Sequence, residues 1–123
     1  MANTTDVRVS ADIKKVGSTD PGVLGRYTDA SNYYMARWSS AGGGVCQLYK
    51  CVAGAFTQLG GDGSDINDLD TVTLVCNGTN ISLEINGVVD IGPISDAAHS
   101  TGKAGIRSPS AGAIIDDFLV ETI

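Results

Sequence analysis

Residues 69–86 read "LDTVTLVCNGTNISLEIN", and this stretch predicts a β-hairpin. Apolar side chains recur at every second position from Val72 to Cys76 and again from Ile81 to Ile85. A period of two is typical of strands that bury one face and expose the other. The dipeptide Asn77–Gly78 between them predicts a two-residue type I′ turn, because both residue types accept a positive φ. That turn would pair Leu74 with Ile81, which keeps the apolar faces of the two strands together.

The sequence on either side continues in short strands. Residues 7–13 alternate apolar and polar side chains. Residues 23–28 and 32–39 flank "DASN", which predicts a hairpin with Asp29 and Asn32 at its turn. Residues 45–52 and 55–59 form a third predicted hairpin, with Gly54 in the turn. About nine or ten strands and no helix longer than a turn predict an all-β, two-sheet antiparallel sandwich.

Length and charge narrow the class of protein. The 123 residues suit a single domain spanning 1–123. The net charge is −6 and the eight Lys and Arg residues are scattered, which argues against nucleic acid and anionic membranes as partners. The start "MANTTDVRVS" has neither a basic nor an apolar signal segment. We therefore expect a cytoplasmic protein or one that leaves by another route, such as packaging into a particle, which would place it on a virion or an extracellular surface.

The order of these units resembles the concanavalin A-like lectin/glucanase superfamily, and within it the laminin G-like jelly-roll modules of bacterial and phage proteins. The resemblance rests mainly on the run from Gly25 to Tyr34, the "NG" at Asn86–Gly87, and the run from Gly102 to Arg107. It implies a jelly-roll β-sandwich. It also implies a further strand or hairpin ahead of residue 6, and we expect this domain to lack it.

No catalytic arrangement is found in the sequence. The glucanases of that superfamily carry Glu-x-Asp-x-x-Glu on one strand, but Glu84 and Glu121 are the two glutamates here and neither lies in such a motif. The lone His99 lies in a polar loop. We therefore predict that the chain is not an enzyme. The three cysteines, Cys46, Cys51 and Cys76, are expected to be buried, reduced thiols.

A metal site is left open as an alternative. Four carboxylates of one polar loop, Asp62, Asp65, Asp68 and Asp70, concentrate oxygen atoms of the kind that calcium prefers. Their spacing does not match an EF-hand, and loops of this composition are usually turns. No cofactor is expected, and calcium is the alternative.

The first half of the chain suggests a glycan site. Sugar sites combine aromatic rings for the apolar faces of pyranoses with Asp, Asn and Arg for their hydroxyls. The candidate residues are Arg26, Asp29, Asn32, Tyr33, Arg37 and Trp38. The opposing interpretation is that Trp38, which shares its parity with Tyr34, is core, and that Tyr33 and Arg37 form the exposed pair.

The C-terminal strand suggests an assembly surface. It is apolar on both faces, and strict alternation places Ile115, Leu119 and Ile123 together on one side. Two functions follow. The first is a structural, decoration or adhesion subunit, plausibly of a phage virion, that contacts other copies or a virion scaffold and presents a glycan-binding face to cell-surface glycans. The alternative is a stand-alone, lectin-like carbohydrate-binding module associated with a glycan-degrading system.

Overall fold

The structure is a computed structural model that describes residues 4–15, 20–40, 44–107 and 114–123. These residues form ten strands: β1 (Val7–Lys14), β2 (Gly22–Asp29), β3 (Asn32–Ser39), β4 (Val45–Val52), β5 (Ala55–Leu59), β6 (Asp70–Asn77), β7 (Asn80–Ile85), β8 (Val88–Ser95), β9 (Lys103–Arg107) and β10 (Ile114–Thr122). None of the described residues belongs to a helix that is long and apolar enough to cross a membrane.

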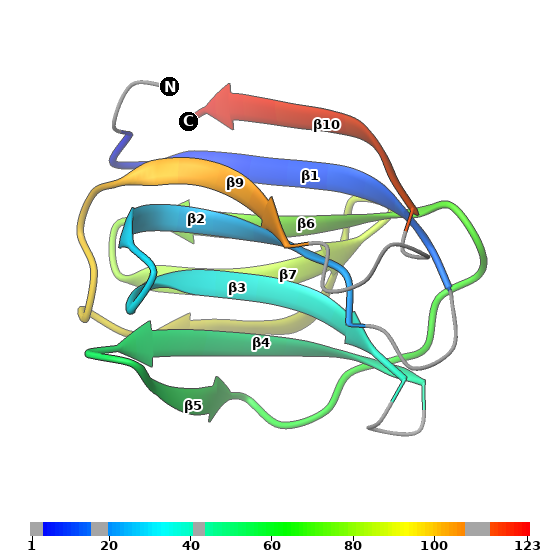
Figure 1. The fold of residues 1–123 in the computed structure, drawn as a ribbon, viewed down its shortest axis with the longest axis horizontal. Coiled ribbons are helices and arrows are strands. Elements are labelled where there is room, and N and C mark those ends of the chain that lie inside the picture. The colour runs from blue at the N-terminus through cyan, green and yellow to red at the C-terminus, as the bar shows by residue number, and fades with distance from the viewer. Residues whose placement is uncertain (1–3, 16–19, 41–43, 108–113) are drawn as a thin grey trace.

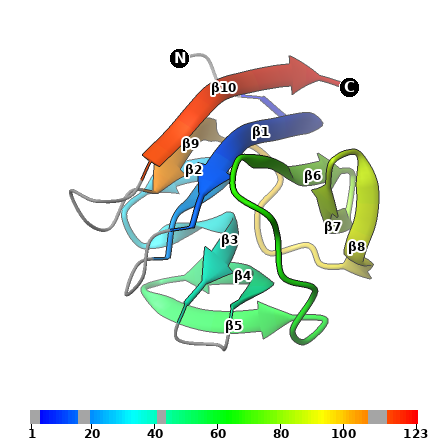
Figure 2. The same cartoon turned by 90° about the vertical axis from the view of Figure 1, so that its right-hand side faces the viewer.

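The strands form two antiparallel sheets of five. One has the order β10-β1-β6-β7-β8 and the other β5-β4-β3-β2-β9 (Figure 1). Figure 2 shows the sheets as two layers, with β1 and β6 in one and β2, β3 and β4 in the other. The prediction of a single-domain, all-β jelly-roll sandwich is confirmed.

The core lies between the layers and follows the alternation in the sequence. Val7, Val9 and Ile13 of β1 are all fully buried, as their period of two predicts. From the facing sheet, Tyr34 and Trp38 of β3 pack into the same cluster. Their burial confirms that the even-numbered residues of β3 belong to the core.

The hairpin of residues 69–86 forms, but its turn differs from the prediction. Leu74 lies opposite Leu83 rather than Ile81, and the two-residue loop is Gly78–Thr79. Gly78 has a φ of 60° and Asn77 and Thr79 are not in the positive-φ region. This pattern matches a type II′ turn, in which glycine takes the first central position. The register changes by two residues, so every apolar side chain keeps its predicted face.

The two other predicted hairpins are confirmed. Asp29 lies opposite Asn32, and the Asp29 carboxylate accepts hydrogen bonds from the Ser31 backbone N–H at 2.8 Å and from the Asn32 side chain at 3.0 Å. These bonds lower the pKa of Asp29. Between β4 and β5, Ala53 and Gly54 both have positive φ, as a type I′ turn requires.

Strand β10 is an edge strand whose alternation is interrupted. It pairs regularly with β1 over residues 119–122 and again over residues 114–116. Between these stretches two β10 residues, Asp117 and Phe118, face one β1 residue, and Asp117 has a φ of 51°. The extra residue is a β-bulge, and it moves every later side chain to the opposite face from the one that strict alternation predicts.

The bulge corrects the predicted assembly surface. Ile115 is partly buried against the core together with Val120, whereas Leu119 is 50% exposed on the opposite face. Ile123 follows the end of the strand and is 57% exposed. Ile115 therefore does not share a surface with Leu119, and the exposed apolar residues at this edge are Phe118, Leu119 and Ile123.

The Gly78 turn gives a test of the register. No atom lies within 4 Å of the position of an added Cβ at Gly78, so Gly78→Val acts through its positive φ alone. We expect a loss of about 1–3 kcal/mol in the free energy of unfolding, measured by denaturant titration. Thr79→Val is the matched control, because Thr79 is exposed and lies outside the positive-φ region. Equal stability of the two variants would contradict this turn.

Candidate functional site

The outer face of the sheet β5-β4-β3-β2-β9 carries aromatic residues from four adjacent strands, of which the phenylalanine is exposed and the three tyrosines are partly buried. Tyr33 of β3 is two strands from Phe56 of β5, with Cys51 of β4 between them. Tyr49 lies opposite Met35 in the next row. Tyr27 of β2 completes a set of four rings, Tyr27, Tyr33, Tyr49 and Phe56, which we call the aromatic face.

The four rings contact one another in a continuous line. Tyr27 stacks on Tyr33 with 5.6 Å between ring centroids. Phe56 meets both Tyr33 and Tyr49 edge to face at 6.2 Å. Such pairs contribute about 0.5–1.5 kcal/mol each and hold the rings in defined orientations. Phe56 is nevertheless 52% exposed, so the line presents ring surface to solvent.

Arg37 extends the aromatic face at one end. Its guanidinium carbon lies 4.7 Å from the Tyr49 ring centroid, and its Nε and Nη2 donate to Oε1 of Gln47 at 3.1 and 2.9 Å. The Gln47 side-chain nitrogen in turn donates to Asp62 at 3.0 Å. Arg37 is thereby held next to an aromatic ring as a hydrogen-bond donor.

Two adjoining grooves open beside Tyr27. The first has a volume of 220 Å³ and is lined by Leu24, Tyr27, Ala30, Tyr33, Ile106 and Arg107. The second has a volume of 380 Å³ and is lined by Leu24, Tyr27, Lys103, Ala104, Gly105 and Ile106. Each groove combines apolar and aromatic walls with one cation, the composition that ligand pockets usually show.

The structure brings four of the six predicted glycan-site residues to this side of the molecule and buries two. Tyr33 and Arg37 lie on the outer face, and Asp29 and Asn32 lie at the β2–β3 turn next to it. Trp38 is 5% exposed, and its indole N–H donates to Asp65 at 2.9 Å. Trp38 is therefore a core residue, as the opposing interpretation of the sequence held.

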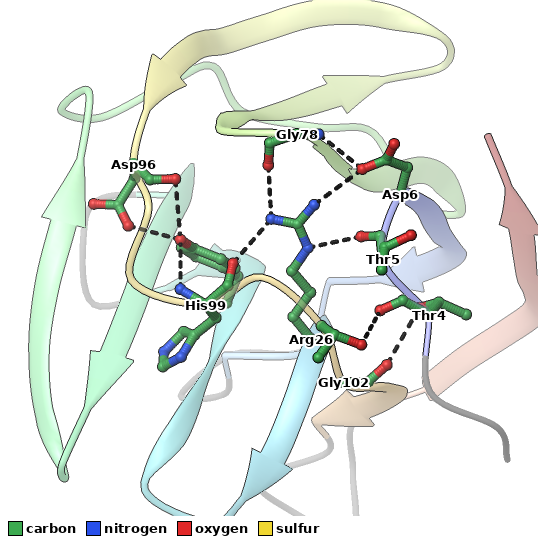
Figure 3. Close-up of polar contacts among 10 residues, drawn as sticks. Thr4, Thr5, Asp6, Arg26, Gly78, Asp96, His99 and Gly102 are labelled. Atoms are coloured by element: carbon green, nitrogen blue, oxygen red, sulfur yellow. Dashed lines mark hydrogen bonds and ion pairs between the residues drawn. The ribbon is translucent and has the colours of Figure 1, made fainter.

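Arg26 is the second buried residue, and it forms a hub of hydrogen bonds rather than part of a surface (Figure 3). It is 2% exposed. Its Nε donates to the Thr5 carbonyl at 2.8 Å, and its Nη1 donates to the carbonyls of Gly78 and His99 at 2.8 and 2.9 Å. Its Nη2 pairs with Asp6 at 3.3 Å. Each of the three nitrogens has an acceptor within the protein and the side chain is buried, so Arg26 does not contribute to the exposed site.

Other close contacts surround this hub. Asp6 also accepts a hydrogen bond from the Gly78 N–H at 2.8 Å. Thr4 forms a bridge with Gly102, and a Cβ on Gly102 would lie 2.2 Å from the carbonyl carbon of Arg26. Only glycine allows the backbones to approach this closely.

The loop between β8 and β9 is held by a second polar cluster. The Tyr34 hydroxyl donates to Asp96 at 2.6 Å, and Lys50 pairs with the same carboxylate at 2.7 Å. Burial by itself raises the pKa of Asp96, but these bonds and one from the Ala98 N–H outweigh it and lower that pKa. The His99 Nε2 lies 2.7 Å from the Cys51 carbonyl oxygen. His99 and Asp96 thus anchor the loop, and Tyr34 is fully buried beneath it.

The acidic loop does not gather its carboxylates around one point. Asp62 accepts from Gln47 and Gln58, which lowers its pKa. Asp65 accepts from the Trp38 indole and from Lys15. Asp68 caps the Lys15 backbone N–H, and Asp70 caps that of Asn67. Among the described residues no group of three or more His, Cys, Asp or Glu side chains is placed to hold a metal ion.

The three cysteines are free and buried. Burial raises the pKa of both Cys46 and Cys76 to about 12. A thiol with so high a pKa stays protonated at neutral pH and is a poor nucleophile. The prediction of buried, reduced thiols is confirmed.

Some residues of the face were not among the predicted site residues. Tyr27, Tyr49, Phe56, Lys103 and Arg107 all line the aromatic face or its grooves. The β4–β5 hairpin pattern could have identified Phe56, because Phe56 pairs with Cys51, two positions from Tyr49 and therefore on the same face. Lys103 and Arg107 are far away in sequence, and only the pairing of β9 with β2 brings them to the site.

Comparison with solved structures finds proteins of the same fold. A carbohydrate-binding module of Bacillus subtilis, CBM66, superposes with a TM-score of 0.79 at 19% sequence identity, over 98% of this chain and 78% of that one. This likeness confirms the fold, a lectin-like β-sandwich. No family model matches the sequence, and no curated protein matches it.

Arg26 gives a test of the hub. Arg26→Met leaves the carbonyls of Thr5, Gly78 and His99 without their buried donor and Asp6 without its ion-pair partner. We expect a loss of about 3 kcal/mol or more in the free energy of unfolding. Arg26→Lys should not restore the lost stability, because a single ammonium group cannot reach all the acceptors that the planar guanidinium group contacts.

The control for this test is Lys103→Met, because Lys103 is an exposed cation of the same sheet. It should cost about 0.5 kcal/mol or less, as most surface substitutions do. Equal destabilisation by Arg26→Met and Lys103→Met would show that the buried hub is not a special contribution to stability.

Proposed function

We propose that this protein is a non-catalytic carbohydrate-binding module, and that the aromatic face and the grooves beside Tyr27 hold the glycan. The observation that carries the proposal is the line of four contacting rings on one exposed sheet face, with Arg37 fixed at its end. The superposition on a protein described as a carbohydrate-binding module supports it.

The chemistry of the face suits a sugar chain. The C–H groups on one face of a pyranose form an apolar surface that packs on an aromatic ring, and its hydroxyls need donors and acceptors at the ring edge. Tyr33 and Phe56 supply ring surface, while Arg37, held in place by Gln47, supplies hydrogen-bond donors on the same face. Because these side chains come from strands rather than from loops, the surface is preorganised and binding orders little of the chain.

A binding experiment tests the proposal. We expect the wild-type protein to bind at least one polysaccharide on a broad glycan array, and Tyr33→Ala to weaken that binding by about tenfold or more, since a central aromatic anchor is removed. Phe118→Ala is the matched control, because Phe118 is an exposed aromatic residue of the other sheet. Isothermal titration calorimetry measures the affinities and thermal melting confirms the fold.

Two results would contradict the proposal. One is a wild-type protein that binds no glycan on the array. The other is a Tyr33→Ala protein that keeps the wild-type affinity while it remains folded.

A second candidate function is a subunit that assembles with its own copies. Strand β10 is a sheet edge, and Phe118, Leu119 and Ile123 expose apolar surface along it. Edge strands with exposed apolar residues favour pairing with another chain, and two antiparallel β10 strands would join two sheets into one.

The native mass tests this second candidate. If the edge pairs with a second copy, the wild-type protein should be a dimer by sedimentation at high concentration, and Leu119→Lys should be a folded monomer. Val88→Lys, at the exposed first residue of β8, should leave the dimer intact. A wild-type monomer at every concentration would rule the second candidate out.

A further inference from the structure

Charge is divided unevenly between the two sheets. The strands of the sheet that bears the aromatic face contain five cations, Arg26, Arg37, Lys50, Lys103 and Arg107, and one carboxylate, Asp29. The strands of the other sheet contain two cations, Arg8 and Lys14, and seven carboxylates, Asp12, Asp70, Glu84, Asp90, Asp116, Asp117 and Glu121. Although the net charge of the chain is −6, the strands of the sheet that bears the aromatic face carry more positive than negative charge.

Three of the five cations lie at the aromatic face. Arg26 is buried in its hub and Lys50 pairs with Asp96, which leaves Arg37, Lys103 and Arg107. Lys103 lies opposite Tyr27, and Gly22 lies between Arg37 and Arg107. Lys103 and Arg107 therefore lie beside Tyr27 and Tyr33, and Arg37 lies beside Tyr49.

These cations are incompletely neutralised. In the described residues no carboxylate lies within ion-pair distance of Lys103 or Arg107. The remaining segments, 1–3, 16–19, 41–43 and 108–113, contain no Asp or Glu. Arg37 has Asp20 at 3.9 Å, the longest of the ion pairs. The Arg107 Nη1 donates to the thioether sulfur of Met35 at 3.6 Å, and a thioether is a weak, uncharged acceptor.

The grooves bring these cations to a ligand. Arg107 lines the groove that Tyr27 and Tyr33 bound, and Lys103 lines the adjoining one. A sugar resting on Tyr33 and Tyr27 would thus have one cation at each end of the two grooves. An unpaired cation in an apolar groove is a recognition element for an anion, because the ligand supplies the missing counter-charge.

We infer that the glycan bound at this site is anionic, a chain whose sugars carry carboxylate or sulfate groups. This inference rests on the proposed carbohydrate-binding function and names the ligand class of the same site. The sugar rings pack on Tyr27 and Tyr33, and the anionic groups reach Lys103 and Arg107. The opposite sheet, with its seven carboxylates, repels the same polymer, so the aromatic face is the surface that such a ligand approaches.

Matched polysaccharides test the inference by isothermal titration calorimetry. Polygalacturonate is compared with its fully methyl-esterified form, and dextran sulfate with dextran, so that each pair differs in charge alone. We expect binding to one or both anionic members, at least about fivefold stronger than to the neutral partner, which corresponds to one exposed ion pair. Which pair discriminates shows whether the anion is a carboxylate or a sulfate.

The salt dependence of the affinity and substitutions of the groove cations test whether these cations bind the anionic groups. Affinity should fall between about 0.1 M and 1 M NaCl, since the Debye length shrinks from ~10 to ~3 Å. Lys103→Gln and Arg107→Gln should each weaken binding by about fivefold. Lys14→Gln removes the same charge from an exposed site on the other sheet and should have no effect.

The inference and the proposed function fail in different ways. Equal affinity for charged and neutral partners, with Tyr33→Ala still abolishing binding, overturns the anionic ligand and leaves a module for neutral glycans. Binding of oligo(dT) as tight as that of the anionic polysaccharide also overturns it, because stacked bases and phosphates would then satisfy the same groups. No binding of any polysaccharide, charged or neutral, overturns the proposed function itself.

Discussion

A single bulge in β2 determines which side chain enters the interior at this point of the sheet and which one joins the candidate site. Between Leu24 and Tyr27 the strand contains two residues where β9 contains one, and Arg26 takes a φ of 47°. Regular alternation would place Arg26 outside and Tyr27 inside. The bulge reverses this order: it turns a guanidinium group into the sandwich and turns Tyr27 outward onto the Tyr33 ring.

A cation buried this way constrains everything that touches it. The free energy of removing a guanidinium from water is offset only if its donors are all satisfied. The acceptors come from three separate segments: the residues before β1, the β6–β7 turn and the β8–β9 loop. Their positions are therefore coupled through Arg26. Tyr34 and Lys50 also hold the β8–β9 loop, because both bind Asp96. This loop leads into β9, and it therefore helps to position Lys103 and Arg107 at the grooves.

The same physics explains what the sequence predicts and what it does not. Where pairing is regular, as in β1 and β3, a period of two assigns each side chain to its face, and Trp38 is buried with Tyr34 as that rule requires. The rule fails at bulges. Arg26 is buried and Ile115 is separated from Leu119 because one residue with positive φ changes the phase of each strand. Arg is uncommon at positive φ, and Asp, although enriched there, mostly adopts other φ values, so the sequence identifies neither position.

The two outer faces of the sandwich provide an internal comparison that bears on function. On the sheet that contains β1, β6 and β7, the outer face uses small polar side chains, among them Ser10, Thr73 and Ser82, and one ion pair between Arg8 and Glu84. Over β1, β6 and β7 that face has no aromatic residue, and Phe118 lies apart from these strands on the edge strand β10. The opposite face of the same chain carries the exposed ring of Phe56, three partly buried tyrosine rings, and Lys103 and Arg107, which have no carboxylate partner among the described residues. The ring contacts add some stability, but the cations do not need to lie there for the sandwich to fold, and the proposed anionic glycan would use both the apolar surface and the positive charge.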